Sequence, residues 1–104
     1  MDITLIPNIC QSLQESKQVV LATIVETKGS TPRKTGTQML IFCDGQVRGT
    51  IGGGCGEAEV KMAALCVFDA GRSTMHTVTM LNDAASEEGM TCGGIMKVFL
   101  QLVG

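Results

Sequence analysis

The sequence predicts an α/β fold, built as a single domain around one mixed β-sheet with a β-hairpin and two main helices. Apolar, β-branched runs alternate with segments in which apolar residues recur every three or four positions. Asp44-Gly45 separates two short apolar runs, which is a strong hairpin signal. A glycine-rich stretch, Gly52 to Gly56, lies where a strand-like run passes into a helix-like one. At 104 residues the chain is expected to be one domain over positions 1–104.

Each expected element follows from a local pattern. A first helix is expected at residues 3–16, where apolar residues recur at spacings of three and four, and a second at 57–70, which Gly71 ends. The inner side of the second helix is expected to be Val60, Ala64, Val67 and Phe68. Strands are expected at 19–26, 37–43, 46–51, 73–80 and 95–102. The first strand is nearly all apolar, which is typical of a strand buried on both faces.

Composition and charge exclude several classes of function. The net charge is −2, with 8 basic and 10 acidic residues, and there is no aromatic–basic run, so no nucleic-acid partner is expected. No apolar run approaches the roughly 20 residues that a membrane span requires, so no membrane partner is expected either. The five cysteines are an odd number, and the N-terminus has no signal-peptide pattern. This combination indicates free thiols and a cytoplasmic location.

The stretch from Thr27 to Gly36 is expected to be a loop because of its Gly, Pro and hydroxyl residues. It holds three of the eight basic residues, namely Lys28, Arg33 and Lys34. Two interpretations stay open. One is a solvated polar turn. The other is an anion-binding loop in which Ser30 and Thr31 donate hydrogen bonds and Arg33 forms a bidentate fork.

The glycine-rich stretch is a candidate anion site. Backbone N–H groups of Gly52–Gly54 can gather round an anion at the positive end of the following helix, where a thiol at Cys55 would be favoured as thiolate. The stretch is neither a P-loop nor a dinucleotide-binding fingerprint, because Glu57 stands where the first requires Lys and the second requires Gly. A generic anion nest remains, since it does not depend on either pattern.

The five cysteines divide into two groups. Their wide spacing lacks the pattern of a zinc site. Cys10, Cys43 and Cys66 fall on apolar faces of expected elements and are expected to be small buried residues. Cys55 and Cys92 each precede a glycine in an expected loop. They are either incidental small residues in turns, or thiols that face one pocket as nucleophile, sulfur carrier or metal-cofactor ligand.

Three glycine-containing segments together resemble the signatures of a known family. They are Gly29-Ser30-Thr31-Pro32-Arg33 with Gly36 and Met39, then Gly49-Thr50-Ile51-Gly52-Gly53-Gly54-Cys55-Gly56-Glu57, and finally Gly89-Met90-Thr91-Cys92-Gly93-Gly94. In order and spacing they are similar to those of the XdhC/CoxI family, which are accessory factors for xanthine dehydrogenase and related molybdenum hydroxylases. The resemblance extends over residues 20–100. Each segment alone is weakly specific, whereas the three in this order are quite specific.

The resemblance implies a molybdenum-cofactor chaperone rather than an enzyme. Such a protein binds the molybdenum cofactor (molybdopterin) transiently. It protects the cofactor while a partner cysteine desulfurase exchanges the terminal oxo ligand for sulfur, and it helps to load the cofactor into an apo molybdenum hydroxylase. No catalytic residue and no resident metal of its own are therefore expected.

By position, the resemblance places the cofactor contacts on all three segments. The expected cofactor-binding residues are Ser30, Arg33, Gly52, Gly53, Gly54, Cys55, Glu57, Cys92 and Gly93. The first five would hold the pterin or its phosphate. The two cysteines would face the molybdenum or sulfur end, and Glu57 would close the loop.

Two departures from the family pattern bear on this expectation. Most members continue into a second, Rossmann-like domain, whereas this sequence stops at Gly104. Three interpretations stay open: a stand-alone short member, a separately encoded second half that would be a partner, or a truncated chain. The apolar, Met-rich composition is also compatible with a homodimer. Gly56 follows the first cysteine, where a larger aliphatic residue is usual.

Two other functions stay open: a thiol redox or persulfide-carrier enzyme that uses Cys55 and Cys92, and a cofactor-free regulatory subunit of a hydroxylase.

Overall fold

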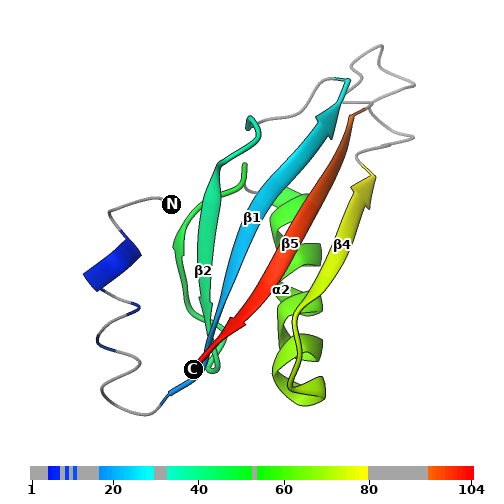
Figure 1. Cartoon of the computed structure of the whole chain (residues 1–104). Helices are drawn as coiled ribbons and strands as arrows, with labels where there is room; N and C mark the ends of the chain where they lie inside the picture. The colour runs from blue at the N-terminus through cyan, green and yellow to red at the C-terminus, as the bar shows by residue number, and fades with distance from the viewer. Residues whose placement is uncertain are drawn as a thin grey trace.

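The fold is a single antiparallel sheet with one long helix against it. The computed structural model describes residues 5–7, 9, 11, 17–29, 33–52, 54–79 and 94–104, with residues 54 and 55 described by their backbone alone. The elements are β1 (Val19–Lys28), β2 (Gln38–Phe42), β3 (Val47–Gly49), α2 (Gly54–Ala70), β4 (Thr74–Thr79) and β5 (Ile95–Val103). The strand order is β3-β2-β1-β5-β4, and α2 lies against one face of the sheet (Figure 1).

Every strand pairing in this sheet is antiparallel, so the expectation of a mixed sheet is wrong. β1, β2 and β3 are neighbours in sequence and in space. α2 then carries the chain from the edge strand β3 to the opposite edge strand β4, and β5 returns between β4 and β1. Because β5 runs against both of its neighbours, no two adjacent strands share a direction.

The hairpin predicted at Asp44-Gly45 is confirmed. β2 and β3 pair in register, with Ile41 opposite Val47. The N–H of Gln46 donates to the Asp44 carboxylate at 3.0 Å, and Gly45 adopts a φ of 88°. Asp and Gly therefore have the roles that a tight turn gives them, side-chain acceptor and left-handed residue.

β1 is the central strand, which explains its nearly continuous apolar sequence. The fully or almost fully buried residues of β1 are Val19, Val20, Leu21, Ala22 and Ile24. A bulge at Val25 shifts the pairing with β5, so that Ile24 is opposite Val98 and Glu26 is opposite Lys97. The bulge breaks the alternation of side chains between the two faces near the end of β1.

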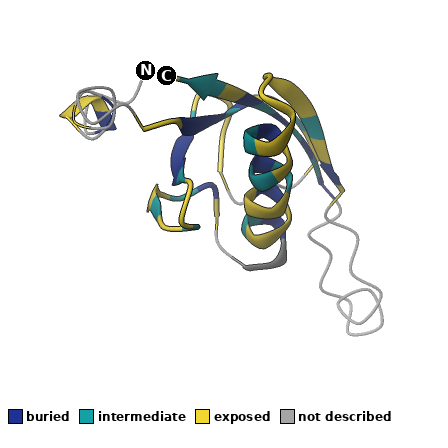
Figure 2. Ribbon diagram, turned by 90° about the horizontal axis from the view of Figure 1, so that it is seen from below, coloured by how far each residue is buried: buried dark blue, intermediate teal, exposed yellow. Residues whose placement is uncertain are grey.

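The main core lies between α2 and the sheet. Val60, Ala64 and Val67 of α2 are buried as predicted, whereas Phe68 is only partly buried at the margin of the core. Figure 2 shows the buried side of α2 turned toward the strands and its opposite side exposed. In the described part of the chain, no helix has the length and apolar character to cross a membrane.

α2 begins at Gly54, three residues before the start expected at Glu57. Cys55 and Gly56 therefore belong to the first turn of the helix and not to a loop. Glycine is a poor helix residue, which is why composition alone places the start later. Contacts made by Glu57 with the preceding backbone offset that preference, as described below.

A smaller apolar cluster covers part of the other face of the sheet. Leu5 and Ile9 pack there on Val19, Leu21 and Leu40. Residues 5–7 form a helical turn where a helix over 3–16 was expected, and Ile6 remains 40% exposed. Among the described residues α2 is the one main helix, so the expectation of two is wrong.

Candidate functional site at the loop end of the sheet

Two of the three glycine-containing segments adjoin neighbouring strands at the same end of the sheet. Lys28, the last residue of β1, is opposite Ile95, the first residue of β5. Ile95 is in turn opposite Thr79, the last residue of β4. The chain leaves Lys28 into the basic loop and enters Ile95 from the second cysteine–glycine segment. We call this end of the sheet, defined by Lys28, Thr79 and Ile95, the loop end.

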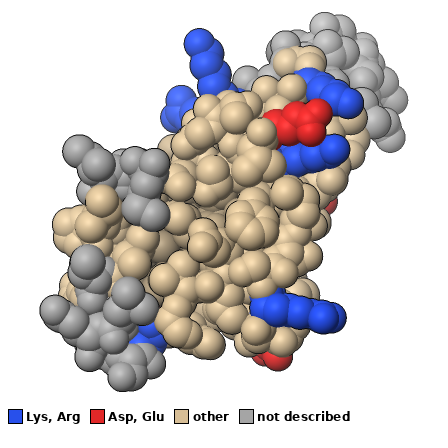
Figure 3. All heavy atoms as spheres, in the orientation of Figure 1, with Lys and Arg blue, Asp and Glu red and all other residues tan. Residues whose placement is uncertain are grey.

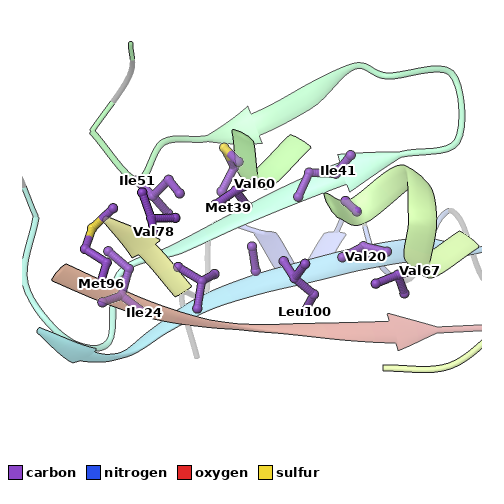
Figure 4. Close-up of a cluster of buried hydrophobic side chains, with 13 residues drawn as sticks. Val20, Ile24, Met39, Ile41, Ile51, Val60, Val67, Val78, Met96 and Leu100 are labelled. Atoms are coloured by element: carbon purple, nitrogen blue, oxygen red, sulfur yellow. The ribbon is translucent and has the colours of Figure 1, made fainter. Parts of the chain in front are cut away.

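The third segment is fixed near the loop end by one buried side chain. Ile51 is 1% exposed and belongs to the main core. In Figure 4 it lies beside Val78, with Met96 and Ile24 close by. Val78 and Met96 are opposite each other one residue from the loop end. Burial of Ile51 therefore anchors the glycine-rich stretch near the end of β4 and the start of β5.

Glu57 holds the start of α2 against the chain that precedes it. Its Oε1 atom accepts a hydrogen bond from the hydroxyl of Thr50 at 2.6 Å and another from the N–H of Ile51 at 3.1 Å. The Thr50 hydroxyl in turn accepts from the N–H of Gly52 at 3.0 Å. One carboxylate in the first helical turn thus satisfies two donors of the preceding stretch, as in a capping box but across a longer segment.

This network places the negative charge of the Glu57 carboxylate beside the glycine-rich stretch. The donors of Thr50 and Ile51 face a carboxylate of the protein itself. A carboxylate is favoured near the positive end of a helix, but it opposes a second anion close by. An anionic ligand near Gly52 would therefore depend on the N–H groups of the first turn of α2, which have no partner within the helix, and on basic side chains.

The basic loop closes on β1 before it enters β2. The N–H of Ile24 donates to the Thr37 carbonyl at 2.9 Å, and the N–H of Gly36 donates to the Ile24 carbonyl at 2.7 Å. These bonds fix the base of the loop. Arg33 and Lys34, both exposed, lie within four residues of that base.

Further basic side chains gather at the loop end. Lys28 Nζ and Lys97 Nζ lie 3.8 and 3.3 Å from the carboxylate oxygens of Glu26. Figure 3 shows basic side chains on both sides of an acidic one at this end of the face opposite α2. Such partly exposed pairs contribute about 0–1 kcal/mol each to stability. One carboxylate between two ammonium groups leaves the cluster with a net positive charge.

Comparison with known proteins identifies the family. The model of the XdhC and CoxI family matches residues 12–79, which is more than half of the chain. The chain belongs to the XdhC and CoxI family. The matched range includes the basic loop, the glycine-rich stretch and all of α2.

Individual relatives agree with this assignment. The uncharacterized protein YqeB of Escherichia coli is 38% identical over 84 residues, which is 81% of this chain and 15% of that protein. A probable xanthine dehydrogenase subunit from Bacillus subtilis is 33% identical over 93 residues, 88% of this chain and 28% of the relative. The molybdenum cofactor insertion chaperone PaoD of Escherichia coli is 39% identical over 62 residues, 60% of this chain and 20% of PaoD.

A solved structure has the same fold. A crystal structure of a xanthine dehydrogenase from Bacillus halodurans matches with a TM-score of 0.74 and 27% identity. The match covers 95% of this chain and 30% of that one. The chain thus spans less than a third of the length of each of these proteins.

The structure describes five of the nine expected cofactor-binding residues. They are Arg33 in the basic loop, and Gly52, Gly54, Cys55 and Glu57 in the glycine-rich stretch and the first turn of α2. Ser30, Gly53, Cys92 and Gly93 lie outside the described residues, so their expected roles remain predictions. Gly52 is exposed and has a φ of 128°, a conformation that favours glycine. The Glu57 side chain accepts hydrogen bonds from Thr50 and Ile51, which join the start of α2 to the chain before it.

Two cysteines do not lie where the sequence predicted. Cys43 and Cys66 were expected to be buried, and both are exposed. Cys66 precedes the buried Val67 and points about 100° away from it round the helix, outside the apolar stripe. Cys43 lies in the turn after β2, where its thiol is 3.1 Å from the Gln18 carbonyl. Cys10 lies outside the described residues.

Sequence reasoning missed Thr50, whereas His76 was interpreted as a structural or exposed residue of its strand. Thr50 carries the hydroxyl between Gly52 and Glu57, and its signal was a hydroxyl residue before the glycines with an acid in the first helical turn. His76 is half-buried, and its Nε2 lies 3.2 Å from Glu59 without the alignment of a hydrogen bond. No three His, Cys, Asp or Glu side chains of the described residues are grouped so as to hold a metal ion.

Proposed function

We propose that this domain is an accessory factor that binds the molybdenum cofactor transiently and acts in the maturation of a xanthine-dehydrogenase-type molybdenum hydroxylase. The observation that carries the proposal is that the basic loop, the glycine-rich stretch and the strand entered from the second cysteine–glycine segment meet at the loop end. Family membership and the similarity to PaoD support the choice of ligand. The site does not resemble a nucleotide-binding loop, as argued above from Glu57.

The described residues suit an anionic cargo in two respects. Arg33 and Lys34 are exposed beside the closed base of their loop, and Lys28 with Lys97 adds positive charge at the same end of the sheet. The first turn of α2 supplies backbone donors, and glycines there permit close approach of a ligand to the backbone. We propose that these groups hold the pterin phosphate, together with Ser30.

The carboxylate of Glu57 disfavours an anionic ligand nearby, and this changes the role that we propose for Glu57. The carboxylate of Glu57 already accepts hydrogen bonds from Thr50 and Ile51. Because a carboxylate is an acceptor and is negatively charged, it does not favour a phosphate beside it. We propose that Glu57 fixes the shape of the glycine-rich stretch rather than contacting the cofactor. Cys55, in the first turn of α2, and Cys92 are the proposed contacts to the molybdenum or sulfur end.

The proposed partners follow from the same function. Sulfuration of the cofactor would require a cysteine desulfurase, and delivery would require the apo molybdenum hydroxylase. The relatives contain much more polypeptide than the matched domain. A separately encoded second half is therefore a further proposed partner.

A retention experiment tests the proposal. The chain is incubated without oxygen with isolated molybdenum cofactor and passed through a gel-filtration column, and molybdenum and pterin are measured in the protein fraction. We expect both to elute with the protein. Cys55→Ala should lose molybdenum, and Arg33→Gln should lose pterin as well. Cys66→Ala is the matched control, because this exposed thiol lies on the same helix three turns away.

Absence of cofactor from the wild-type fraction, with and without a candidate second half, would contradict the proposal. A disulfide between Cys55 and Cys92 that cycles with a reductant would instead favour a thiol enzyme. Co-purification with a hydroxylase in the absence of bound cofactor would favour a regulatory role without cofactor binding.

A further inference from the structure

The two edges of the sheet differ in how well they are protected against pairing with another strand. β3 has three residues, carries the exposed Arg48 and ends at Gly49 with a φ of 80°. β4 has six residues, Thr-Met-His-Thr-Val-Thr, and contains no Lys, Arg, Asp, Glu or Pro. Its register with β5 is continuous from Thr74 to Thr79. Short length, charge, proline and bulges are the usual means of blocking an edge strand, and β4 has none of them.

We propose that β4 pairs antiparallel with β4 of a second copy of this chain, giving one sheet continuous through both copies. The strand is self-complementary when the two-fold axis passes through Thr77. Thr77 is then opposite Thr77 of the second copy, His76 is opposite Val78, and Met75 is opposite Thr79. Thr–Thr pairs stabilise antiparallel sheets, and no like charges are opposite each other in this register.

The side chains of β4 suit this arrangement on both faces of the sheet. Met75, Thr77 and Thr79 are exposed, and Met75 is 51% exposed although it is a large apolar side chain. They project from the face opposite α2, since Val78, which alternates with them, belongs to the core beneath α2. Pairing would bring the two exposed Met75 side chains onto one shared surface, where each lies beside a threonine methyl group.

Charged groups and helices leave room for the second copy. α2 contacts β1, β5 and β4, so it is centred over β5. The two β5 strands would be three strand spacings apart, about 14 Å. This separation exceeds the 8–10 Å of directly packed helices. Lys97 of β5 is opposite Thr77, so the two Lys97 side chains are separated by a similar distance, beyond the screening length of about 8–10 Å.

The neutral character of the edge favours a second copy over a charged partner. A strongly acidic or basic strand would find no counter-charge among the residues of β4. On the helix side, Glu59 of α2 lies beside this strand, with its carboxylate 3.2 Å from His76 Nε2. Because main-chain hydrogen bonds contribute most of the contact, the association should be weak and concentration-dependent.

Sedimentation equilibrium of the full chain from about 1 μM to about 1 mM tests the proposal, since this range brackets weak affinities. The wild type should pass from monomer to dimer. Thr77→Lys and Thr77→Glu each place like charges opposite each other, and each should weaken the dimer at least about tenfold. An equimolar mixture of the two variants should form a heterodimer as tight as the wild type or tighter. Arg48→Glu, on the opposite edge, is the control and should behave as the wild type.

Amide hydrogen exchange provides a second readout that does not depend on a variant. At high protein concentration alternate amides of β4 should exchange more slowly than at low concentration, and those of β3 should not change. A wild type that stays monomeric throughout the range contradicts the proposal. So does unchanged dimerisation in both Thr77 variants, or a dimer in which β4 exchange is unaffected by concentration.

Discussion

At the scale of single residues, Glu57 determines the local structure of the candidate site. Its carboxylate receives the Thr50 hydroxyl and the Ile51 N–H, so one side chain joins the end of the hairpin to the first turn of α2. Ile51 is itself buried, so its N–H has little access to water if the carboxylate is removed. An unsatisfied buried donor is more costly than the net value of the hydrogen bond.

We predict that Glu57→Ala lowers the free energy of unfolding by about 1–3 kcal/mol, because two donors lose their acceptor. Glu57→Gln keeps an acceptor oxygen and should cost about 1 kcal/mol or less. Urea denaturation with a fitted midpoint and slope measures both. The control is Glu59→Gln, whose partner His76 is partly exposed, with an expected change of at most about 1 kcal/mol. Equal stability of Glu57→Ala and wild type would mean that the hydrogen bonds do not hold the loop.

Gly49 and Gly71 form a second residue-scale comparison. Both have a positive φ, 80° and 70°, but a Cβ at position 49 would lie 3.0 Å from the Gln38 carbonyl oxygen, whereas one at 71 would meet nothing within 4 Å. We predict a loss of about 1 kcal/mol for Gly71→Ala, which is the backbone term alone. Gly49→Ala should lose about 1–3 kcal/mol more than that. Thermal or urea unfolding of the two variants side by side measures the difference. Equal losses of stability would show that the Gln38 backbone of β2 can shift away from the added Cβ at no cost in free energy.

At the scale of elements, the connection from β3 to α2 depends on the burial of Ile51. This side chain is 1% exposed and packs in the core beneath α2, where Figure 4 shows it beside Val78. Among the described residues of the main core, it is the one that lies between two elements rather than within one. The position of the glycine-rich stretch is therefore coupled to the packing of the helix on the sheet.

We predict that Ile51→Ala costs about 2–5 kcal/mol and Ile51→Val about 0.5–1.5 kcal/mol, as for other large-to-small changes in a core. The milder variant should remain folded and should retain less molybdenum cofactor, because the loop start is less well fixed. Urea denaturation and the gel-filtration assay measure the two effects. Met62→Ala is the control, since Met62 is 65% exposed on α2 and should change stability by no more than about 0.5 kcal/mol. Full cofactor retention by Ile51→Val would mean that cofactor binding does not depend on how firmly Ile51 fixes the glycine-rich stretch.

The elements differ in how well the sequence predicted them. The five strands and the hairpin were predicted close to their observed bounds, because β-branched runs and Asp44-Gly45 are local signals. The start of α2 was predicted too late, since the contacts of Glu57 that support the glycines are not visible in local composition. Cys66 was expected in the apolar stripe because it is an apolar residue, but the prediction did not take account of its angular position round the helix.

At the scale of the whole molecule, the strand order creates the candidate site. β5 lies between β4 and β1, so the end of β1 and the start of β5 are adjacent although they are far apart in sequence. The sequence motifs suggested that three segments belong together, but they did not predict which strand ends are adjacent. Strand order and register are set by long-range packing, which no local pattern records, and the predicted mixed sheet was wrong for this reason.

The central claim is that the three segments form one cofactor site at the loop end. Amide hydrogen exchange of the full chain with and without isolated molybdenum cofactor tests it most directly. We predict slower exchange in 29–36, 50–57 and 89–94 together, with no change in the hairpin turn 43–46, which lies at the opposite end of the sheet (Figure 1). Slower exchange in one segment alone, or in the hairpin turn instead, would contradict a shared site at the loop end.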